Sequence, residues 1–144
     1  MKVRKPFSPR NHKANDAIGK NAVLQLLKRM DVDAEENPNP YGVDIIVKNR
    51  DRTYEVERRA IWHTTWPHPT VHIPERKTKY LKPDMIYAVV NIECDRVMLC
   101  SSEVILKYPQ VEVPNKSIAA GEYFYDVPLT EWQVYDVEDN DGKT

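Results

Sequence analysis

The chain has 144 residues, of which 41% are hydrophobic and 30% charged, and its formal net charge is −1 at pH 7. This length suits one domain with a single core, and the near-neutral charge excludes a protein that is basic over its whole surface. No hydrophobic run approaches the roughly 18 residues of a membrane-spanning helix and the N-terminus lacks a signal-peptide core, which predicts a cytoplasmic protein without membrane contact. Cys94 and Cys100 have no metal-type spacing, so we expect free thiols.

The charges are unevenly distributed along the chain. Residues 1–14 contain no acid and carry the basic residues Lys2, Arg4, Lys5, Arg10 and Lys13. This composition predicts a flexible basic arm that either keeps the protein soluble or contacts phosphate groups. Residues 136–144 are rich in acids and predict a disordered tail. We therefore expect a single folded domain over residues 15–135.

An amphipathic helix is predicted from Asn15 or Asp16 to about Met30. Asparagine and aspartate are good N-cap residues, and hydrophobic residues follow them at intervals of three and four. This stripe consists of Ile18, Ala22, Val23, Leu26, Leu27 and Met30. The main role expected for the helix is packing against the core.

A β-hairpin is predicted between Tyr41 and Trp62. Residues 41–47 and 53–62 are rich in β-branched and aromatic residues, and the polar segment 48–52 between them is typical of a turn.

Acidic side chains gather on one face of this hairpin. Alternation along the second strand places Glu55, Glu57 and Arg59 on the same face. Asp44 lies among apolar neighbours, where a carboxylate is costly to desolvate unless it is paired or binds a metal. Carboxylates that converge across a hairpin could bind Mg²⁺, which needs few of them besides waters and phosphates. Alternating charges can equally form the solvated face of a strand.

The segment after the hairpin is rich in histidine, tryptophan and proline. His63, His68 and His72 fit no zinc-binding spacing, and the prolines between them prevent a helix. His72 is instead a candidate for contact with phosphate or water. Trp62 and Trp66 either pack this loop or stack on bases.

A basic segment follows, in which Pro74 suits the first turn of a short helix. The segment carries the cations Arg76, Lys77, Lys79 and Lys82. Like charges at this density destabilise an isolated helix, so the segment either faces an anionic partner or forms an exposed basic surface. Because it follows the strand that carries Glu57, it can border the same cleft, where Lys77 or Lys79 would supply a cation.

The C-terminal half predicts more β-structure. Met85–Ile92 is a continuous hydrophobic run, which indicates a buried central strand. Val97–Cys100 is expected to pair with it as a hairpin, and Ser101 or Ser102 can cap a short helix. One further strand is expected near Tyr123–Val127.

The acidic hairpin and the order of the elements resemble the core of the PD-(D/E)xK nuclease superfamily, the restriction-endonuclease-like fold. The predicted order up to Ile92 is helix, short strand, strand with Asp44, strand with Glu57, helix and buried strand. This order is similar to the αβββαβ core of the family. The resemblance implies an α/β fold with a mixed central sheet flanked by helices and, here, extra C-terminal strands.

The motif of the family can be placed in two registers. In the first, Gly42-Val43-Asp44 carries one metal-binding acid and Glu57 the second, with Arg59 where the family has lysine. In the second, Glu55-Val56-Glu57 forms the Glu-x-Glu variant seen in some restriction enzymes. Arginine keeps the positive charge of the lysine but cannot readily give up a proton.

The resemblance implies an endonuclease that hydrolyses DNA phosphodiester bonds and depends on Mg²⁺ or Mn²⁺. The implied catalytic residues are Asp44, Glu57, Arg59 and Lys77. The implied metal ligands are Asp44, Glu55 and Glu57. The nucleic-acid contacts expected from the basic segment and from the histidine-rich loop are Arg76, Lys77, Lys79 and His72.

The chain has no sequence-reading module such as a helix-turn-helix or a zinc finger. We therefore expect an enzyme selective for branched or nicked DNA, of a kind that suits a phage or mobile element, and a homodimer is the assembly that it could form. One alternative is an inactive nuclease-fold protein that binds nucleic acid or a protein, which Arg59 favours. Another is a small α/β interaction module whose charged strand face is merely solvated.

Overall fold

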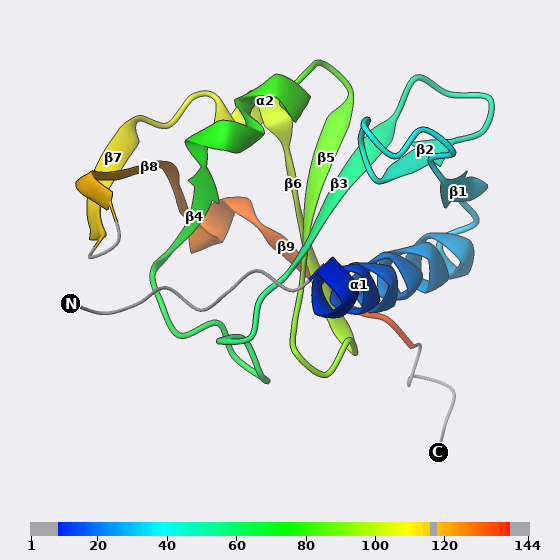
Figure 1. Cartoon of the computed structure of the whole chain (residues 1–144). Helices are drawn as coiled ribbons and strands as arrows, with labels where there is room; N and C mark the ends of the chain where they lie inside the picture. The colour runs from blue at the N-terminus through cyan, green and yellow to red at the C-terminus, as the bar shows by residue number, and fades with distance from the viewer. Residues whose placement is uncertain (1–8, 116–117, 139–144) are drawn as a thin grey trace.

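The computed structural model describes residues 9–115 and 118–138 of the chain. It contains one long helix, a six-stranded β-sheet and a smaller three-stranded sheet (Figure 1). Residues 1–8 of the predicted basic arm and residues 139–144 of the predicted acidic tail lie outside the described residues. Within the described ranges, no helix is long and apolar enough to cross a membrane.

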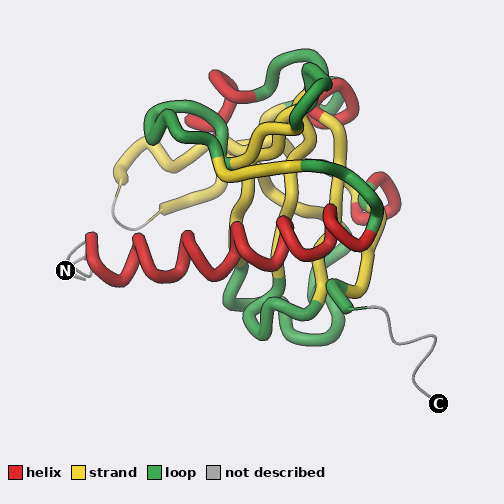
Figure 2. The backbone as a smooth tube through the Cα atoms, turned by 90° about the vertical axis from the view of Figure 1, so that its right-hand side faces the viewer, coloured by secondary structure: helices red, strands yellow, loops and turns green. Residues whose placement is uncertain are grey.

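Helix α1 spans Pro9–Arg29 and lies across one face of the large sheet (Figure 2). It begins before the predicted start at Asn15, so residues 9–14, which were expected to be a flexible arm, belong to the helix. Ile18 and Met30, at the two ends of the predicted hydrophobic stripe, remain exposed. The buried side chains from the stripe are Ala22, Val23, Leu26 and Leu27.

The six-stranded sheet has the strand order β1-β2-β3-β5-β6-β9. Its strands are β1 (Ala34–Glu36), β2 (Ile45–Val47), β3 (Thr53–Arg58), β5 (Met85–Val90), β6 (Arg96–Ser101) and β9 (Gln133–Asp136). β3 and β5 run parallel and the other neighbouring pairs are antiparallel, so the sheet is mixed, as predicted. Residues 87–90 of β5 are fully buried, which confirms the predicted central strand.

The smaller sheet is antiparallel and has the order β4-β8-β7. Its strands are β4 (Thr70–Pro74), β8 (Ile118–Pro128) and β7 (Gln110–Asn115). The strand predicted near Tyr123–Val127 therefore lies within the longer β8.

Short helical turns connect the strands: η1 (Glu75–Tyr80), α2 (Ser102–Ile105) and η2 (Leu129–Glu131). Ser101 caps α2 by accepting a hydrogen bond from the Val104 amide, as predicted.

Two hydrophobic clusters lie on the two faces of the large sheet. One packs α1 against the sheet and includes Leu26 and Val56. The other fills the space between the two sheets and includes Trp62 and Tyr87. The mixed α/β class is thus confirmed. The sheet was expected to be flanked by helices, but the one long helix, α1, covers a single face, and the small sheet packs with the short α2 on the other.

The crossover from β3 to the parallel β5 explains this difference. A helical crossover needs a continuous amphipathic stretch, and Pro67, Pro69 and Pro74 interrupt this segment. The chain instead forms β4 and the 3₁₀-helix η1, which carries the basic residues of the predicted short helix. The crossover thereby places a basic turn close to β3.

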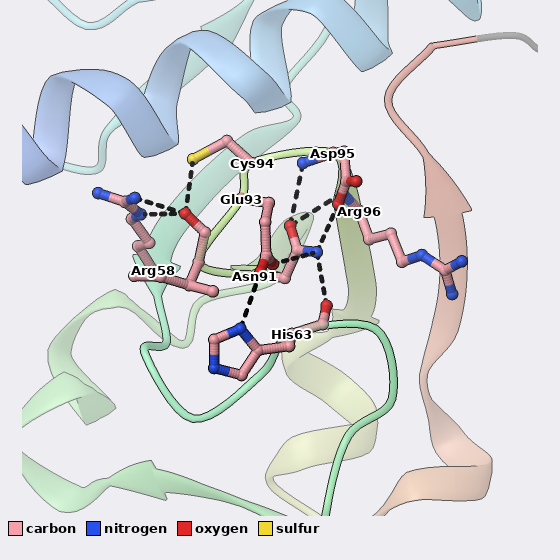
Figure 3. A network of polar contacts seen from close by, with 8 residues as sticks. Arg58, His63, Asn91, Glu93, Cys94, Asp95 and Arg96 are labelled. Carbon is pink, nitrogen blue, oxygen red and sulfur yellow. Dashed lines mark hydrogen bonds and ion pairs between the residues drawn. The ribbon is translucent and has the colours of Figure 1, made fainter.

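A buried asparagine ties the turn between β5 and β6 to the loop after β3 (Figure 3). The Asn91 Nδ2 donates hydrogen bonds to the His63 carbonyl at 2.8 Å and to the Asp95 carboxylate at 2.6 Å. Its Oδ1 accepts hydrogen bonds from the amides of Asp95 and Arg96, both at 3.0 Å. Because Asn91 is fully buried, it satisfies groups that would otherwise be unpaired.

Candidate functional site

Asp44 and Glu55 face each other across the pair formed by β2 and β3. Ile45 pairs with Tyr54 in antiparallel register, which places residue 44 opposite residue 55 and on the same face of the sheet. The Asp44 Oδ2 accepts a hydrogen bond of 2.8 Å from the Val56 amide, which orients this carboxylate. The structure therefore brings these two sequence-predicted acids together.

Glu55 is a buried carboxylate whose side chain is only 4% exposed. Its Oε1 receives no hydrogen bond from any described residue. Burial first, and then hydrogen bonding to and repulsion by Asp44, raises the pKa of Glu55 to about 7, although Lys77 acts in the opposite direction. A carboxylate held in this way exchanges its proton near neutral pH, and one of its oxygens is buried without a hydrogen bond from any described residue.

Two lysines from different elements approach the two acids. The Lys77 Nζ, from η1, lies 2.8 Å from the Glu55 Oε2. The Lys20 Nζ, from α1, lies 3.6 Å from the Asp44 Oδ1 and 3.2 Å from the Glu36 Oε1. The basic crossover turn thus reaches the site, at the position where the sequence analysis expected a lysine to replace Arg59.

The acids and the cations line a cleft of about 450 Å³. Its charged lining residues are Asp44, Glu55, Glu57, Arg58, Arg76 and Lys77. A second cavity of about 570 Å³ adjoins it, and the two share Pro40, Gly42 and Asp44. Asp44 is therefore accessible from both cavities.

Glu57 lines the same cleft, but neighbouring groups engage both of its oxygens. The Tyr87 hydroxyl donates a hydrogen bond of 2.5 Å to the Oε2, and the Arg59 Nε lies 2.5 Å from the Oε1. Arg59 also donates to the His72 carbonyl, and its guanidinium lies over the ring of Trp66. Arg59 lines a separate cavity of about 270 Å³, so it does not share the cleft of Asp44 and Glu55.

The predicted nucleic-acid contacts fall into two groups. Arg76 and Lys77 line the cleft. The Lys79 Nζ instead lies over the ring of Tyr80, 5.0 Å from its centroid. His72 lies 3.1 Å from the Asp126 Oδ1 and stacks on Phe124, on the face of the small sheet. The histidine thus lines the Arg59 cavity and not the cleft of the acids.

The sequence analysis did not single out Lys20, Tyr80 or Tyr87 as functional residues. Lys20 reaches Asp44 only because α1 crosses the sheet at that point, and no local pattern predicts this crossing. Tyr87 lies beside Glu55 in the parallel register of β3 and β5, which is a long-range pairing. For Tyr87 the sequence offered only one indication: side chains alternate along a strand, so residue 87 has to lie on one defined face of β5.

The donor set fits a hard cation with few protein ligands. Within the described part of the chain, no group of three or more histidine, cysteine or acidic side chains is placed to bind a metal. Mg²⁺ is commonly held by one or two carboxylates plus waters and phosphates. Asp44 and Glu55 supply such a pair, and the Glu55 Oε1 lacks a hydrogen-bond donor among the described residues.

No family model, curated protein or solved structure matches the chain. Its chemistry follows from the paired acids, the neighbouring lysines and the cleft that they line. Such an arrangement can bind a cation beside an anionic substrate.

Proposed function

We propose that this protein is a divalent-metal-dependent endonuclease that hydrolyses DNA phosphodiester bonds on a restriction-endonuclease-like core. The observation that carries the proposal is the buried Glu55, which faces Asp44 and contacts Lys77 in a cleft lined by further cations. A carboxylate buried beside a second one is costly unless a cation joins them.

The order of the elements supports the nuclease core. Helix α1 precedes the antiparallel strands β1, β2 and β3, and a crossover then leads to the parallel β5. This order resembles the αβββαβ core of the superfamily, with the strand β4 and the 3₁₀-helix η1 in place of the crossover α-helix. Asp44 immediately precedes the second strand and Glu55 lies on the third, which is similar to the placement of the acids in the motif of that family.

The geometry favours the register in which Asp44 and Glu55 are the metal ligands. A bound Mg²⁺ or Mn²⁺ would supply an acidified water and polarise the scissile phosphate. Lys77 stabilises negative charge on the phosphate oxygens and, unlike an arginine, can also transfer a proton. Glu57 lines the wall of the cleft, and Arg59 acts as a positioning residue for Glu57.

A plasmid-nicking assay with Mg²⁺ tests the proposal. We expect the wild type to nick supercoiled DNA, and we expect Asp44→Asn and Glu55→Gln to abolish nicking while the circular-dichroism spectrum stays unchanged. Glu57→Gln is the matched control, because it makes the same change on the same strand face and should leave measurable nicking. Full activity in Glu55→Gln would reject the site.

A second candidate is an inactive nuclease-fold protein that binds nucleic acid. It is favoured by the contacts of Lys20 and Lys77 with the two carboxylates, because these lysines can neutralise the acids without a metal. DNA binding by the wild type without nicking in either Mg²⁺ or Mn²⁺ would support this candidate over the enzyme.

A further inference from the structure

The loop between β1 and β2 presents an aromatic side chain at the junction of the two cavities. Tyr41 is 87% exposed, the largest exposure among the exposed large hydrophobic residues of the described chain. Its chain neighbours Pro40 and Gly42 line both cavities. The segment Pro40–Gly42, called the ridge below, therefore carries Tyr41 where the two cavities share lining residues, although Tyr41 itself lines neither cavity.

Hydrogen bonds from two asparagines hold this loop in place. The Asn39 Oδ1 accepts from the Tyr41 amide at 3.0 Å, and the Asn37 Oδ1 accepts from the Asn39 amide at 3.0 Å. The Asn37 Nδ2 donates to the Val43 carbonyl at 2.9 Å, which joins the loop to the chain just before Asp44. The tyrosine is thus displayed on an ordered turn.

The loop leaves little room for a side chain at position 42, which is a glycine. A Cβ atom at position 42 would lie 2.7 Å from the Asn37 Nδ2, which is closer than such contacts normally come. The Asn37 side chain, which donates to the Val43 carbonyl, would have to shift to make room. The sequence therefore keeps the loop compact beneath an aromatic ring that has little protein to pack against.

The charges around the ridge suit a nucleic acid. The cations that line the two cavities are Lys20, Arg58, Arg76 and Lys77. The acids that line them are Glu36, Asp44, Glu55 and Glu57. A divalent cation on Asp44 and Glu55 would offset two of the four acids, and the two cavities together would then carry an excess of positive charge. Phosphates are attracted to such a surface.

We propose that Tyr41 is a stacking wedge that selects DNA with an unpaired base at a nick, flap or branch. This inference rests on the proposed nuclease function and specifies its substrate class. An exposed ring can stack on a base only where that base has lost a stacking neighbour, as it has where strands separate. The cavities on the two sides of the ridge then receive the two diverging strands, and the Asp44 site lies between them.

The test compares the binding of a fluorescently labelled flap, single strand and fully paired duplex, with Ca²⁺ in place of Mg²⁺. We expect the wild type to bind the flap more tightly than the duplex. Because stacking contributes ~1–3 kcal/mol per base, Tyr41→Ala should weaken flap binding about tenfold. Its duplex affinity should not change, and Tyr41→Phe should keep the flap preference. Tyr123→Ala, which removes another exposed tyrosine outside both cavities, is the matched control.

A base analogue gives an independent readout. The fluorescence of 2-aminopurine at the branch point should be quenched by the wild type and by Tyr41→Phe, but not by Tyr41→Ala. Equal flap affinity of Tyr41→Ala and wild type would overturn the wedge and leave the nuclease proposal intact. If the wild type bound none of the three DNA forms, both proposals would fail. Because Tyr41 is exposed, Tyr41→Ala should not unfold the protein. Weaker binding by this variant would therefore report a lost contact with DNA.

Discussion

Because the pKa of Glu55 is raised, the free energy of unfolding should depend on pH, and this dependence can be measured without any substrate. Folding raises the pKa of this carboxyl from 4.5 to about 7. The folded state therefore binds this proton more tightly than the unfolded state. The resulting stabilisation is fully present below about pH 4.5 and is lost as the pH rises through about 7.

The magnitude follows from proton linkage. With these two pKa values, about 2–3 kcal/mol of stability is lost between about pH 5 and pH 8, since one pKa unit corresponds to ~1.4 kcal/mol. Glu55→Gln cannot ionise and should not lose this contribution. For a chain of this size, the pH-dependent change in Tm should differ between wild type and variant by roughly 8 °C.

Thermal and urea unfolding of both proteins at several pH values, in the absence of divalent ions, measures this difference. Titrating groups that do not interact with Glu55 contribute equally to the two proteins and cancel, so the difference reports Glu55 together with its partners Asp44 and Lys77. Glu103→Gln, a change at an exposed position on α2, is the control and should follow the wild type. If stability changed with pH in the same way in wild type and Glu55→Gln, Glu55 could not be a buried acid whose pKa is raised by Asp44.

Three further predictions concern catalysis and folding. Nicking should rise with pH through about 7, because Glu55 must lose its proton to bind a metal; a flat rate between about pH 5.5 and 8.5 would contradict this. Lys77→Met should lower nicking and shift this rise to higher pH, since Lys77 lowers the pKa of Glu55; pH–rate profiles of both proteins check the shift. Asn91→Ala should destabilise the fold by about 2–3 kcal/mol in urea unfolding, because it leaves buried groups unpaired, and a loss below about 0.5 kcal/mol would argue against that role.

Local patterns predicted the parts of the site that lie within one hairpin. The alternation of β3 places Glu55 and Glu57 on one face, and the apolar surroundings of Asp44 mark it as unusual. The same reasoning predicted the buried β5 from its hydrophobic run. These features depend on neighbouring residues in the sequence, so the sequence carries enough information to place them.

Features that depend on distant pairing could not be predicted in this way. The long β8 pairs not only with the neighbouring β7 but also with β4, which lies far earlier in the chain. The direction of the Arg59 side chain depends on Trp66 and on the His72 carbonyl, which the crossover loop brings near. Tyr41 was expected in a strand, but β2 begins only at Ile45, and the asparagine-rich turn before it leaves the ring exposed.

The central claim, that Asp44 and Glu55 together bind a divalent cation, is tested most directly by isothermal titration with Mn²⁺ in buffers of different ionisation enthalpy near pH 7. We predict that the wild type binds Mn²⁺ and releases protons on binding, because burial and Asp44 keep Glu55 partly protonated near neutral pH. Asp44→Asn and Glu55→Gln should not bind, whereas Glu57→Gln should. Wild-type protein that binds no Mn²⁺, or Glu55→Gln that binds it with unchanged affinity, would contradict the claim.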